Sequence, residues 1–561
     1  MKNRESLNRR EFLARVKRIT AATAAIGALG LPSLADPISA SASQESSGCE
    51  IGRLKGKERA SAAFNVRLDA ALYERNLPLA DHACNSSEQS YPSMIANYSK
   101  CLPHNDLGEV DLDAYNALIH ALETGDPRDF EAIPMGGVVR LTNPQAALAF
   151  DLQGPDSHQL TVPPAPAFNS AQQASEMAEL YWQALARDVP FSEYASHPIP
   201  YQAAVDLTRF SDFRGPKVDS QVTTNLLFRG NTSGDLAGPY LSQFLSMDIP
   251  YGALPVKHQI QAPRPGTNHM IRYDECMAIQ SGQRALARSG EFDPTLRYIR
   301  NGRDLGEFVH RDFPYQCTLN AAMILLGMEA PSDQGNPYLE SRTQMGFTTF
   351  GVPHLVHMVA LVGDLALKAA WYQKWLVHRR LRPEEFSARV HNHMTGRAQY
   401  PIHPDLTAVT PVLNLTFESN RSQAGAGTYL LSQAYPEGCP THPAYPAGHA
   451  TFAGAGITIL KAFFDESYVI PNPGIASSDG LTLLPYTGGP ELTVGGELNK
   501  LAMNIAMGRN FAGIHWRTDA SESLKLGEAV AIGVLTEMKL TLNEAFKGFT
   551  LTKLDGTTIT I

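Results

Sequence analysis

Apolar and polar residues alternate with a helical period in most segments of the chain that show any period. Apolar side chains recur at steps of three and four, which places them on one face of a helix. This spacing predicts helices over residues 60–74, 171–187, 319–326, 355–381, 450–464, 501–507 and 524–546. Strand-like stretches are short and few, at 138–141 and 551–561, and the loops are long and rich in Pro and Gly. We therefore expect an all-α fold, one large helical bundle domain.

Composition supports a globular chain and excludes several classes of protein. The 561 residues are 43% hydrophobic and 18% charged, and the formal net charge is −9. A mild acidic excess argues against a general nucleic-acid binder, which would be basic. The sequence contains no glycine-rich loop of the dinucleotide or nucleoside-triphosphate type, so those folds lack their signature.

The first 42 residues differ from the rest and predict a twin-arginine export signal. Arg9 and Arg10 precede a weakly apolar stretch from Ile19 to about Leu34, and small residues at 40–42 offer a cleavage site. The order of these parts is typical of export signals. We expect a periplasmic or secreted protein whose single domain covers residues 43–561. No later stretch of about 20 uninterrupted apolar residues occurs, so no membrane is expected for the mature chain.

The six cysteines contain no Cys-x-x-Cys pair, which removes zinc-ribbon and thioredoxin readings. An exported chain permits disulfides. Cys84 and Cys101 bracket a polar loop, and we predict that they pair. The remaining four are left open between disulfides and buried thiols.

A first candidate patch contains Lys374 and Arg382 at the end of a predicted helix. Pro383 disfavours helix at the preceding residue, so we expect the helix to stop near Leu381 and Arg382 to lead into a loop. Cations at a helix C-terminus also suit the helix dipole, and a solvated basic helix end is the alternative.

A second patch, residues 442–450, runs from a Pro/Gly-rich loop into an Ala-rich helix that begins near His449. Such a helix start presents backbone N–H groups to an anion, with His449 at its mouth. The alternative is a polar residue that merely begins a helix.

A third patch, residues 508–519, contains Arg509, His515 and Asp519. Arg509 and His515 are about 240° apart on a straight helix, so they share a face only if the helix breaks, and Gly513 offers that break. His515 and Asp519 are four apart and could bond, which would fix the ring tautomer. A surface pair is the alternative.

Together the patches offer one Lys, two Arg, a helix start and two His, a combination suited to a tetrahedral oxyanion. One imidazole could bond to the central atom and the other could transfer protons.

The three patches resemble the motifs of vanadium haloperoxidases and the related acid phosphatases over roughly residues 55–545. The matching residues are Lys374, Arg382, Pro383, Pro446, Gly448, His449, Arg509, Gly513, His515 and Asp519. The eight-residue step from Lys374 to Arg382, with Trp371 and His442, resembles the algal and cyanobacterial bromoperoxidase branch.

The resemblance implies a bundle with two four-helix-bundle-like cores and a vanadate cofactor. His515 would be the vanadium ligand, with Lys374, Arg382, Arg509 and the Gly448 N–H around the oxygens. His449 would transfer the proton of hydrogen peroxide, and Lys374 would polarise it. Trp371 and His442 would shape the halide pocket, and Asp312 would pair with Arg509 or Lys374. A halide and a small organic acceptor are the expected substrates, a homodimer or larger homo-oligomer the expected assembly, and a structural calcium ion an addition the family allows.

One position departs from the family pattern. Ala447 stands where the family has serine, which removes a hydroxyl donor and roughly 1–2 kcal/mol of oxyanion stabilisation. Two alternatives therefore stay open. One is an acid phosphatase that uses the same site, and the other is an oxyanion-binding protein with impaired catalysis.

Overall fold

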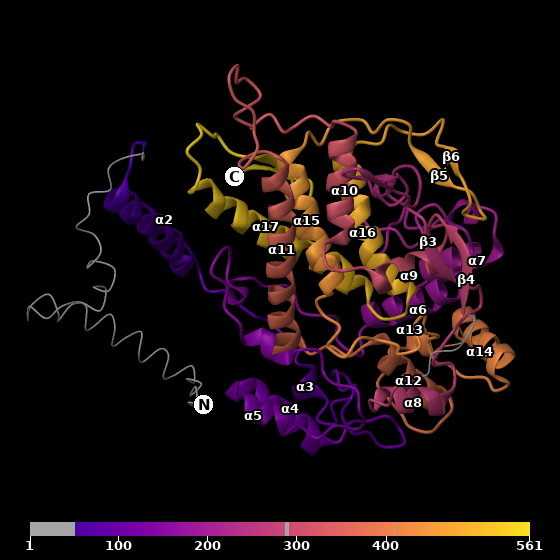
Figure 1. Cartoon of the computed structure of the whole chain (residues 1–561). Coiled ribbons are helices and arrows are strands. Elements are labelled where there is room, and N and C mark those ends of the chain that lie inside the picture. Colours follow the sequence, from indigo (N-terminus) through magenta and orange to yellow (C-terminus); the bar gives the residue numbers. More distant parts are fainter. Residues whose placement is uncertain (1–50, 286–290, 409) are drawn as a thin grey trace, which may run out of the picture.

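The computed structural model describes residues 51–285, 291–408 and 410–561. Helices joined by long loops make up the body of the molecule, and the few strands are short (Figure 1). The predicted all-α fold is confirmed. The predicted export signal and Cys49 lie outside the described residues.

Helix α15 (Gly448–Phe463) forms the centre of the core, and all its residues except His449 are buried. It packs against α11 (Val352–Tyr372), α16 (Val494–Phe511) and α17 (Arg517–Lys539). A Cβ on Gly454 of α15 would meet the Leu524 backbone of α17, and one on Gly527 would meet the Thr451 carbonyl. The two helices therefore approach closely because glycines line their contact.

A second group of helices surrounds α6 (Ala171–Leu185), which contacts α7 (Pro198–Thr208), α13 (Pro404–Thr407) and α14 (Pro411–Ala424). Helix α9 (Gly302–Arg311) packs on α16, and α10 (Gln316–Gly327) packs on α11 and α15. One continuous hydrophobic cluster joins both groups.

The remaining elements cover the edges. The other helices are α2 (Gly56–Asn76), α3 (Ser87–Ser90), α4 (Leu112–Thr124), α5 (Pro127–Glu131), α8 (Tyr273–Gln280) and α12 (Pro383–Met394). Short 3-10 turns lie at Pro144–Leu148, Ser157–Gln159, Phe191–Glu193 and Gln243–Leu245. The described strands form four antiparallel pairs: β1 (Ile249–Tyr251) with β2 (Leu254–Val256), β3 (Ile260–Pro263) with β4 (Phe292–Arg297), β5 (Gly474–Ala476) with β6 (Leu483–Pro485), and β7 (Thr550–Thr552) with β8 (Thr558–Thr560).

The predicted helix over 355–381 ends earlier than expected. α11 gives way to a π-helical turn, η6 (Gln373–His378), and Arg379 is left-handed at φ 40°. Arg382 lies in the non-helical connection after η6, as expected, but this connection is only residues 379–382. Arg382 also caps α12, because Pro383 suits the first position of a helix as well as it disfavours helix at the residue before it.

Two local predictions are wrong. Residues 138–141 form no strand. Val139 donates to the Gly282 carbonyl at 3.0 Å, but no ladder of such bonds follows among the described residues. Cys84 and Cys101 are both free: Cys84 is exposed, whereas Cys101 is buried. The polar loop between them does not bring the two thiols together.

The segment Val352–His378 is the one helix, among the described residues, that is long and apolar enough to cross a membrane. Half of its apolar window is buried inside the molecule, and it contacts α15 and α17. Its hydropathy therefore reflects its place in the core.

Candidate active site

The three sequence patches meet around one cavity of about 190 Å³ at the end of the core bundle. Its walls come from α11, the start of α15, the end of α16 and the turn before α17. The lining residues are Asp312, Pro314, Leu367, Trp371, His442, Gly448, His449, Phe452, Arg509 and His515. Lys374, Arg382, Ala447 and Asp519 are buried directly behind this wall.

His515 is held in one tautomer. Its Nδ1 lies 2.8 Å from Asp519 Oδ2, and its Nε2 lies 3.0 Å from Nη1 of Arg382. A guanidinium only donates, so Nε2 is the acceptor and Nδ1 carries the hydrogen that Asp519 accepts. Burial first, and then the charges of Arg382 and Lys374, hold the pKa of His515 well below its usual range. The neutral ring therefore keeps a lone pair on Nε2, as a metal ligand must.

The break between α16 and α17 brings Arg509 and His515 to the same site. α16 ends at Phe511, and Gly513 has φ 88°. A Cβ at Gly513 would lie 2.9 Å from the Gln433 side chain. The chain turns here because glycine alone adopts this conformation without strain. The predicted break at Gly513 is confirmed.

The Lys374 ammonium is fully buried and bonds only carbonyl oxygens, at 2.7 Å from Pro443 and 2.9 Å from Ala444. Burial, together with the charges of Arg382 and Arg509, lowers its pKa well below 10.5. A buried cation without a counter-ion is costly, so this position favours the arrival of an anion.

The two arginines also lack acidic partners. Arg382 donates to the carbonyls of His442 and Ile514. Arg509 donates to the Val309 carbonyl, and its buried Nε has no hydrogen-bond partner in the described part of the chain. Across residues 51–285, 291–408 and 410–561, no carboxylate forms an ion pair with Lys374, Arg382 or Arg509.

The start of α15 adds neutral donors. The backbone N–H groups of Gly448, His449 and Ala450 precede the first intrahelical bond, which Thr451 donates to Ala447, and they find no acceptor in the described structure. A Cβ on Gly448 would lie 3.2 Å from Leu367 and 3.4 Å from Trp371, so glycine keeps this wall open. Three uncompensated cations, free amides and one unprotonated imidazole fit a compact oxyanion such as vanadate.

Ala447 caps α15 without a side-chain hydrogen bond. Its own N–H donates to Ser523 Oγ at 2.7 Å. The hydroxyl of Ser523 therefore fixes the backbone of this position and leaves the missing donor of Ala447 unreplaced.

The partner expected for Asp312 is wrong. Asp312 pairs with neither Arg509 nor Lys374, and its Oδ1 lies 2.9 Å from Nε2 of His449. Asp312 follows the last residue of α9 and contacts His449 in the first turn of α15, so its partner depends on how these two helices lie against each other. Burial lowers the pKa of His449, and the Asp312 carboxylate opposes that shift.

Trp371 and His442 lie together in the cavity wall, as expected. Their ring centroids are 4.7 Å apart. Nδ1 of His442 lies 3.0 Å from Nη2 of Arg382 and 3.2 Å from the Pro443 carbonyl oxygen. Because the guanidinium can only donate, we assign Nδ1 as the acceptor of the shorter contact. Burial, Lys374 and Arg382 keep the pKa of His442 well below 6.5. The ring is neutral and its Nε2–H is available.

Several wall and support residues escaped the sequence analysis. Leu367 and Phe452 lie four residues from Trp371 and Gly448, so helical spacing could have found them. Arg380 gave no signal within its run of basic residues. It bonds Asp519 Oδ1 at 2.8 Å, Glu176 at 3.1 Å and Gln173 at 2.7 Å.

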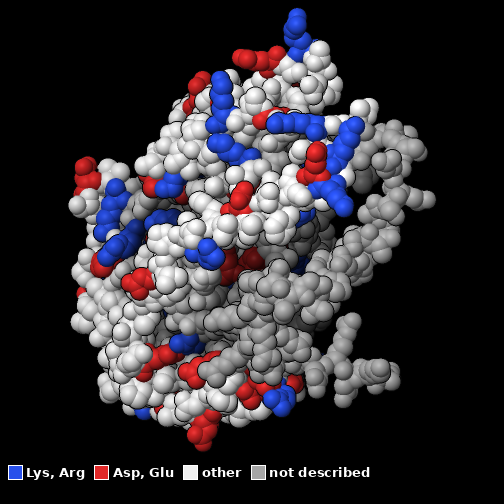
Figure 2. Space-filling view, turned by 90° about the vertical axis from the view of Figure 1, so that its left-hand side faces the viewer, with Lys and Arg blue, Asp and Glu red and all other residues white. Residues whose placement is uncertain are grey.

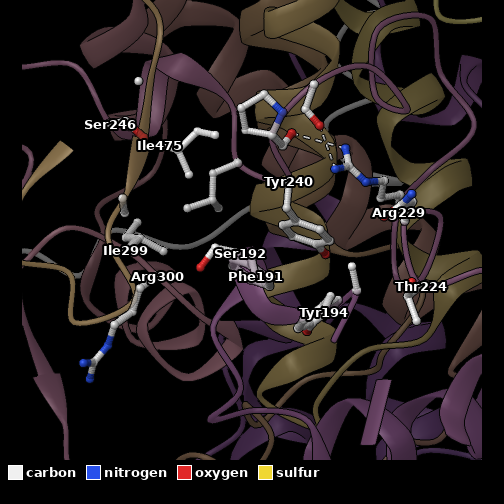
Figure 3. A pocket seen from close by; sticks show the side chains of 17 residues that line it. Phe191, Ser192, Tyr194, Thr224, Arg229, Tyr240, Ser246, Ile299, Arg300 and Ile475 are labelled. Atoms are coloured by element: carbon white, nitrogen blue, oxygen red, sulfur yellow. Dashed lines mark hydrogen bonds between the residues drawn. The ribbon is translucent and has the colours of Figure 1, made fainter. Parts of the chain in front are cut away.

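A larger cavity, of about 290 Å³, lies near the opposite end of α9 and contains none of the predicted site residues (Figure 3). Phe191 stacks on Tyr240 there, with ring centroids 4.0 Å apart. The Nη groups of Arg229 already donate to the carbonyls of Asp235, Gly238 and Pro239, and the Arg300 guanidinium points away from the cavity. This cavity offers no imidazole among its lining residues, so the smaller cavity is the better candidate.

Known proteins share both the sequence and the fold. Residues 354–544 match the family model described as the second helical-bundle domain of VCPO. A vanadium-dependent bromoperoxidase of Ascophyllum nodosum is 37% identical over 511 residues, 87% of this chain and 90% of the relative. The vanadium-dependent bromoperoxidase of Corallina pilulifera is 35% identical and covers 90% of this chain and 99% of its own.

The structural comparison agrees. The homohexameric structure of the second vanadate-dependent bromoperoxidase of Ascophyllum nodosum superimposes with a TM-score of 0.86 and 30% identity, over 91% of each chain. Nearly the whole chain, and not the site motifs alone, is therefore shared. The chain belongs to the family of vanadium-dependent bromoperoxidases.

Proposed function

We propose that this chain is a vanadate-dependent peroxidase that oxidises halide, bromide above others, with hydrogen peroxide. The product is an oxidant at the hypohalite level, which halogenates small organic acceptors. One observation carries the proposal: Arg382, Lys374 and Arg509, three cations without acidic partners, lie close enough to His515 to lower its pKa further than burial alone, and the unprotonated His515 lines the cavity. This arrangement would hold an oxyanion such as vanadate, with Nε2 of His515 available to bond to its central atom.

Each residue around vanadate has a different role. His515 would bond to vanadium through Nε2, while Lys374, Arg382, Arg509 and the Gly448 N–H would hold the oxygens. Bound vanadate supplies a Lewis-acid centre that activates peroxide. Lys374 carries a compact point charge, unlike the two guanidinium groups, and we assign it the polarisation of the peroxide oxygen.

We assign proton transfer to His449. It lines the cavity, and its side chain keeps 23% of its surface exposed, so solvent protons reach it. Asp312 holds the ring through Nε2 at 2.9 Å. A histidine fixed by a carboxylate and facing the cavity suits the removal of a proton from peroxide.

We propose that the halide binds in the cavity beside the adjoining rings of Trp371 and His442. The neutral His442 ring presents its Nε2–H, and the Trp371 ring supplies a polarisable wall. A large, weakly hydrated anion is stabilised by one hydrogen-bond donor next to an aromatic surface. The Lys374 ammonium lies 5.9 Å from the Trp371 ring centroid and adds a positive charge nearby.

The peroxidase is favoured over the two alternatives, an acid phosphatase and an oxyanion-binding protein without catalysis. Relatives that span 87–90% of this chain are named bromoperoxidases, which favours the peroxidase over the phosphatase. An oxyanion-binding protein without catalysis would not need His449 to be held against Asp312 in the same cavity.

Reconstitution of the purified protein with orthovanadate tests the proposal. Peroxide and bromide are then supplied with monochlorodimedone, and phosphate-ester hydrolysis is measured in parallel. We expect bromination that requires vanadate and disappears in His515→Ala. Ester hydrolysis inhibited by vanadate, without bromination, would instead identify a phosphatase.

Two further assignments complete the proposal. The twin-arginine pattern supports export to the periplasm or medium. The homohexameric relative supports a homo-oligomer for this chain. We propose no position for the calcium ion that the family allows, because no three His, Cys, Asp or Glu side chains gather to hold a metal within the described ranges.

A further inference from the structure

Tyr435 is buried beside Arg509, outside the lining of the smaller cavity. The guanidinium carbon of Arg509 lies over the Tyr435 ring, 5.5 Å from its centroid, and Nη1 lies 3.5 Å from the phenol oxygen. The face of an aromatic ring attracts a cation, and Arg509 is one of the three cations of the site that lack an acidic partner. Tyr435 therefore gives this cation an aromatic support.

The position of Tyr435 follows from the break between α16 and α17. Tyr435 belongs to the loop that connects α14 to α15, and the residue before it, Ala434, donates its N–H to the Ala512 carbonyl at 3.0 Å. Ala512 is the first residue after α16, and it packs with Tyr435 in one small apolar cluster. The turn that brings Arg509 and His515 together thus also brings the Tyr435 ring to Arg509.

Helix α9 holds both side chains. The Tyr435 hydroxyl donates to the Gly306 carbonyl at 2.6 Å, and Nη1 of Arg509 donates to the Val309 carbonyl, about one turn later. Burial raises the pKa of Tyr435 above its usual value, so the phenol keeps the hydrogen that it donates. Since a phenol has one hydrogen to donate, the hydroxyl cannot also donate to a bound oxyanion. Tyr435 can therefore act on the site only through Arg509.

His310 keeps the Tyr435 ring in place. The two rings stack with centroids 3.7 Å apart and planes 7° apart. Nε2 of His310 lies 2.7 Å from a Glu437 carboxylate oxygen, and Nδ1 lies 3.4 Å from one of Glu307. Burial alone would lower the pKa of His310, but the two carboxylates outweigh it and raise that pKa. The Tyr435 ring is thus fixed by a stack at its face and a hydrogen bond at its hydroxyl.

The direction in which Arg509 points matters, because buried charges dominate the attraction of an anion to this site. On the face that Figure 2 shows, Lys and Arg side chains lie interspersed with Asp and Glu, so the exposed charges of that face form no broad patch of one sign. Buried charges are screened much less than exposed ones, and their effect depends on their distance from the anion.

We propose that Tyr435 is a positioning residue whose ring holds Arg509 toward the oxyanion. The inference rests on the proposed function, since it takes vanadate as that oxyanion. With Nη1 bonded to α9 and the ring packed against the guanidinium, Arg509 is kept from turning away from the cavity that it lines. Its buried Nε has no partner among the residues that the structure describes, and it remains for an oxygen of the anion.

Equilibrium dialysis of the full chain with orthovanadate tests the proposal. Tyr435→Leu should weaken vanadate binding by about 5- to 30-fold, the range expected for loss of a buried cation–aromatic contact. Tyr435→Phe keeps the ring and should bind within about threefold of the wild type. If phenylalanine weakens binding as much as leucine does, the hydroxyl and not the ring sets the affinity, and the proposal is overturned.

Tyr240→Leu is the matched control. The Tyr240 hydroxyl donates to the Phe228 carbonyl at 2.8 Å, and its ring centroid lies 5.3 Å from the Arg229 guanidinium carbon. It therefore has the same two kinds of contact in the larger cavity, and its loss should leave vanadate affinity unchanged. An equal weakening in Tyr240→Leu and Tyr435→Leu would show a general effect of removing a buried tyrosine and would overturn the proposal.

A double-mutant cycle with Arg509→Met separates positioning from a structural role. In the Arg509→Met background Tyr435→Leu should have no further effect on vanadate affinity, because no guanidinium is left to hold. An equal loss in both backgrounds would contradict the proposal. If binding by Arg509→Met is too weak to measure, the comparison of Tyr435→Phe with Tyr435→Leu decides. Dialysis needs no turnover, so a wild type that binds vanadate without bromination overturns the proposed function alone, and a wild type that binds no vanadate overturns both.

Discussion

Asp519 accepts a hydrogen bond from Nδ1 of His515 at 2.8 Å, and this contact decides which nitrogen faces the cavity. The same carboxylate oxygen accepts the Trp516 N–H at 3.1 Å, at the start of α17. One side chain therefore starts the helix and orients the vanadium ligand.

Asp519→Asn should weaken vanadate binding by roughly 10- to 100-fold, the usual cost of losing a partner of a metal-bound histidine. If the amide oxygen of the new side chain faces His515, its N–H₂ group faces Arg380, and two donors oppose each other. If the amide is turned the other way, no oxygen accepts from Nδ1 of His515, and the tautomer of the ring is no longer fixed. Equilibrium dialysis with orthovanadate measures the change. If Asp519→Asn changes the affinity for vanadate by less than twofold, Asp519 only stabilises the start of α17 and does not orient His515.

Arg380 anchors this carboxylate from behind. It bridges Asp519 and Glu176, and all three side chains are at most 2% exposed. Removing one member of such a buried network leaves uncompensated charge.

Arg380→Met should therefore lower the free energy of unfolding by about 3–5 kcal/mol, measured by urea denaturation. Arg128→Met is the comparison, because Arg128 pairs with Asp126 at 2.6 Å but is 88% exposed. Surface pairs of this kind contribute about 0–1 kcal/mol. Equal losses in both variants would contradict the role given to Arg380.

The sequence predicts the components of the site better than their contacts. The break at Gly513 and the start of α15 follow from proline and glycine, whose backbone limits are local. The partner of Asp312 cannot be predicted from such local limits, because it depends on how α9 lies against α15. The same holds for Arg380, whose carboxylate partners are 139 and 204 residues away.

The local errors have a similar origin. Lys374 lies in a π-helical turn, whereas the sequence predicts an ordinary helix there. The sequence misses the turn because its extra residue is set by packing and not by the local pattern. The Cys84–Cys101 pair was expected from the loop between them, yet Cys101 is held inside by a bond from its N–H to the Gln280 carbonyl at 2.8 Å.

Ala447→Ser should tighten vanadate binding by about 5- to 30-fold, since a hydroxyl that donates to a charged oxygen contributes roughly 1–2 kcal/mol. The residue precedes Gly448 at the cap of α15, where serine also stabilises a helix. Titration of vanadate against recovered bromination gives the affinity, and Ala447→Gly serves as the variant without a hydroxyl. If serine and glycine bind equally, the missing donor has no part in vanadate affinity.

Asp312→Asn should move the His449-dependent limb of the pH profile to lower pH. The carboxylate favours the charged imidazole and opposes the desolvation that lowers the pKa of His449, so its loss lowers that pKa further. An opposite charge at this distance typically accounts for one to three pH units. A limb that requires the protonated ring, or one that requires the neutral ring, shifts in the same direction.

The measurement is kcat/KM for bromide from pH 4 to 9 on the vanadate-loaded enzyme. Glu307→Gln is the control, because Glu307 contacts His310 at 3.4 Å and not His449; a limb that moves equally in both variants would belong to another group.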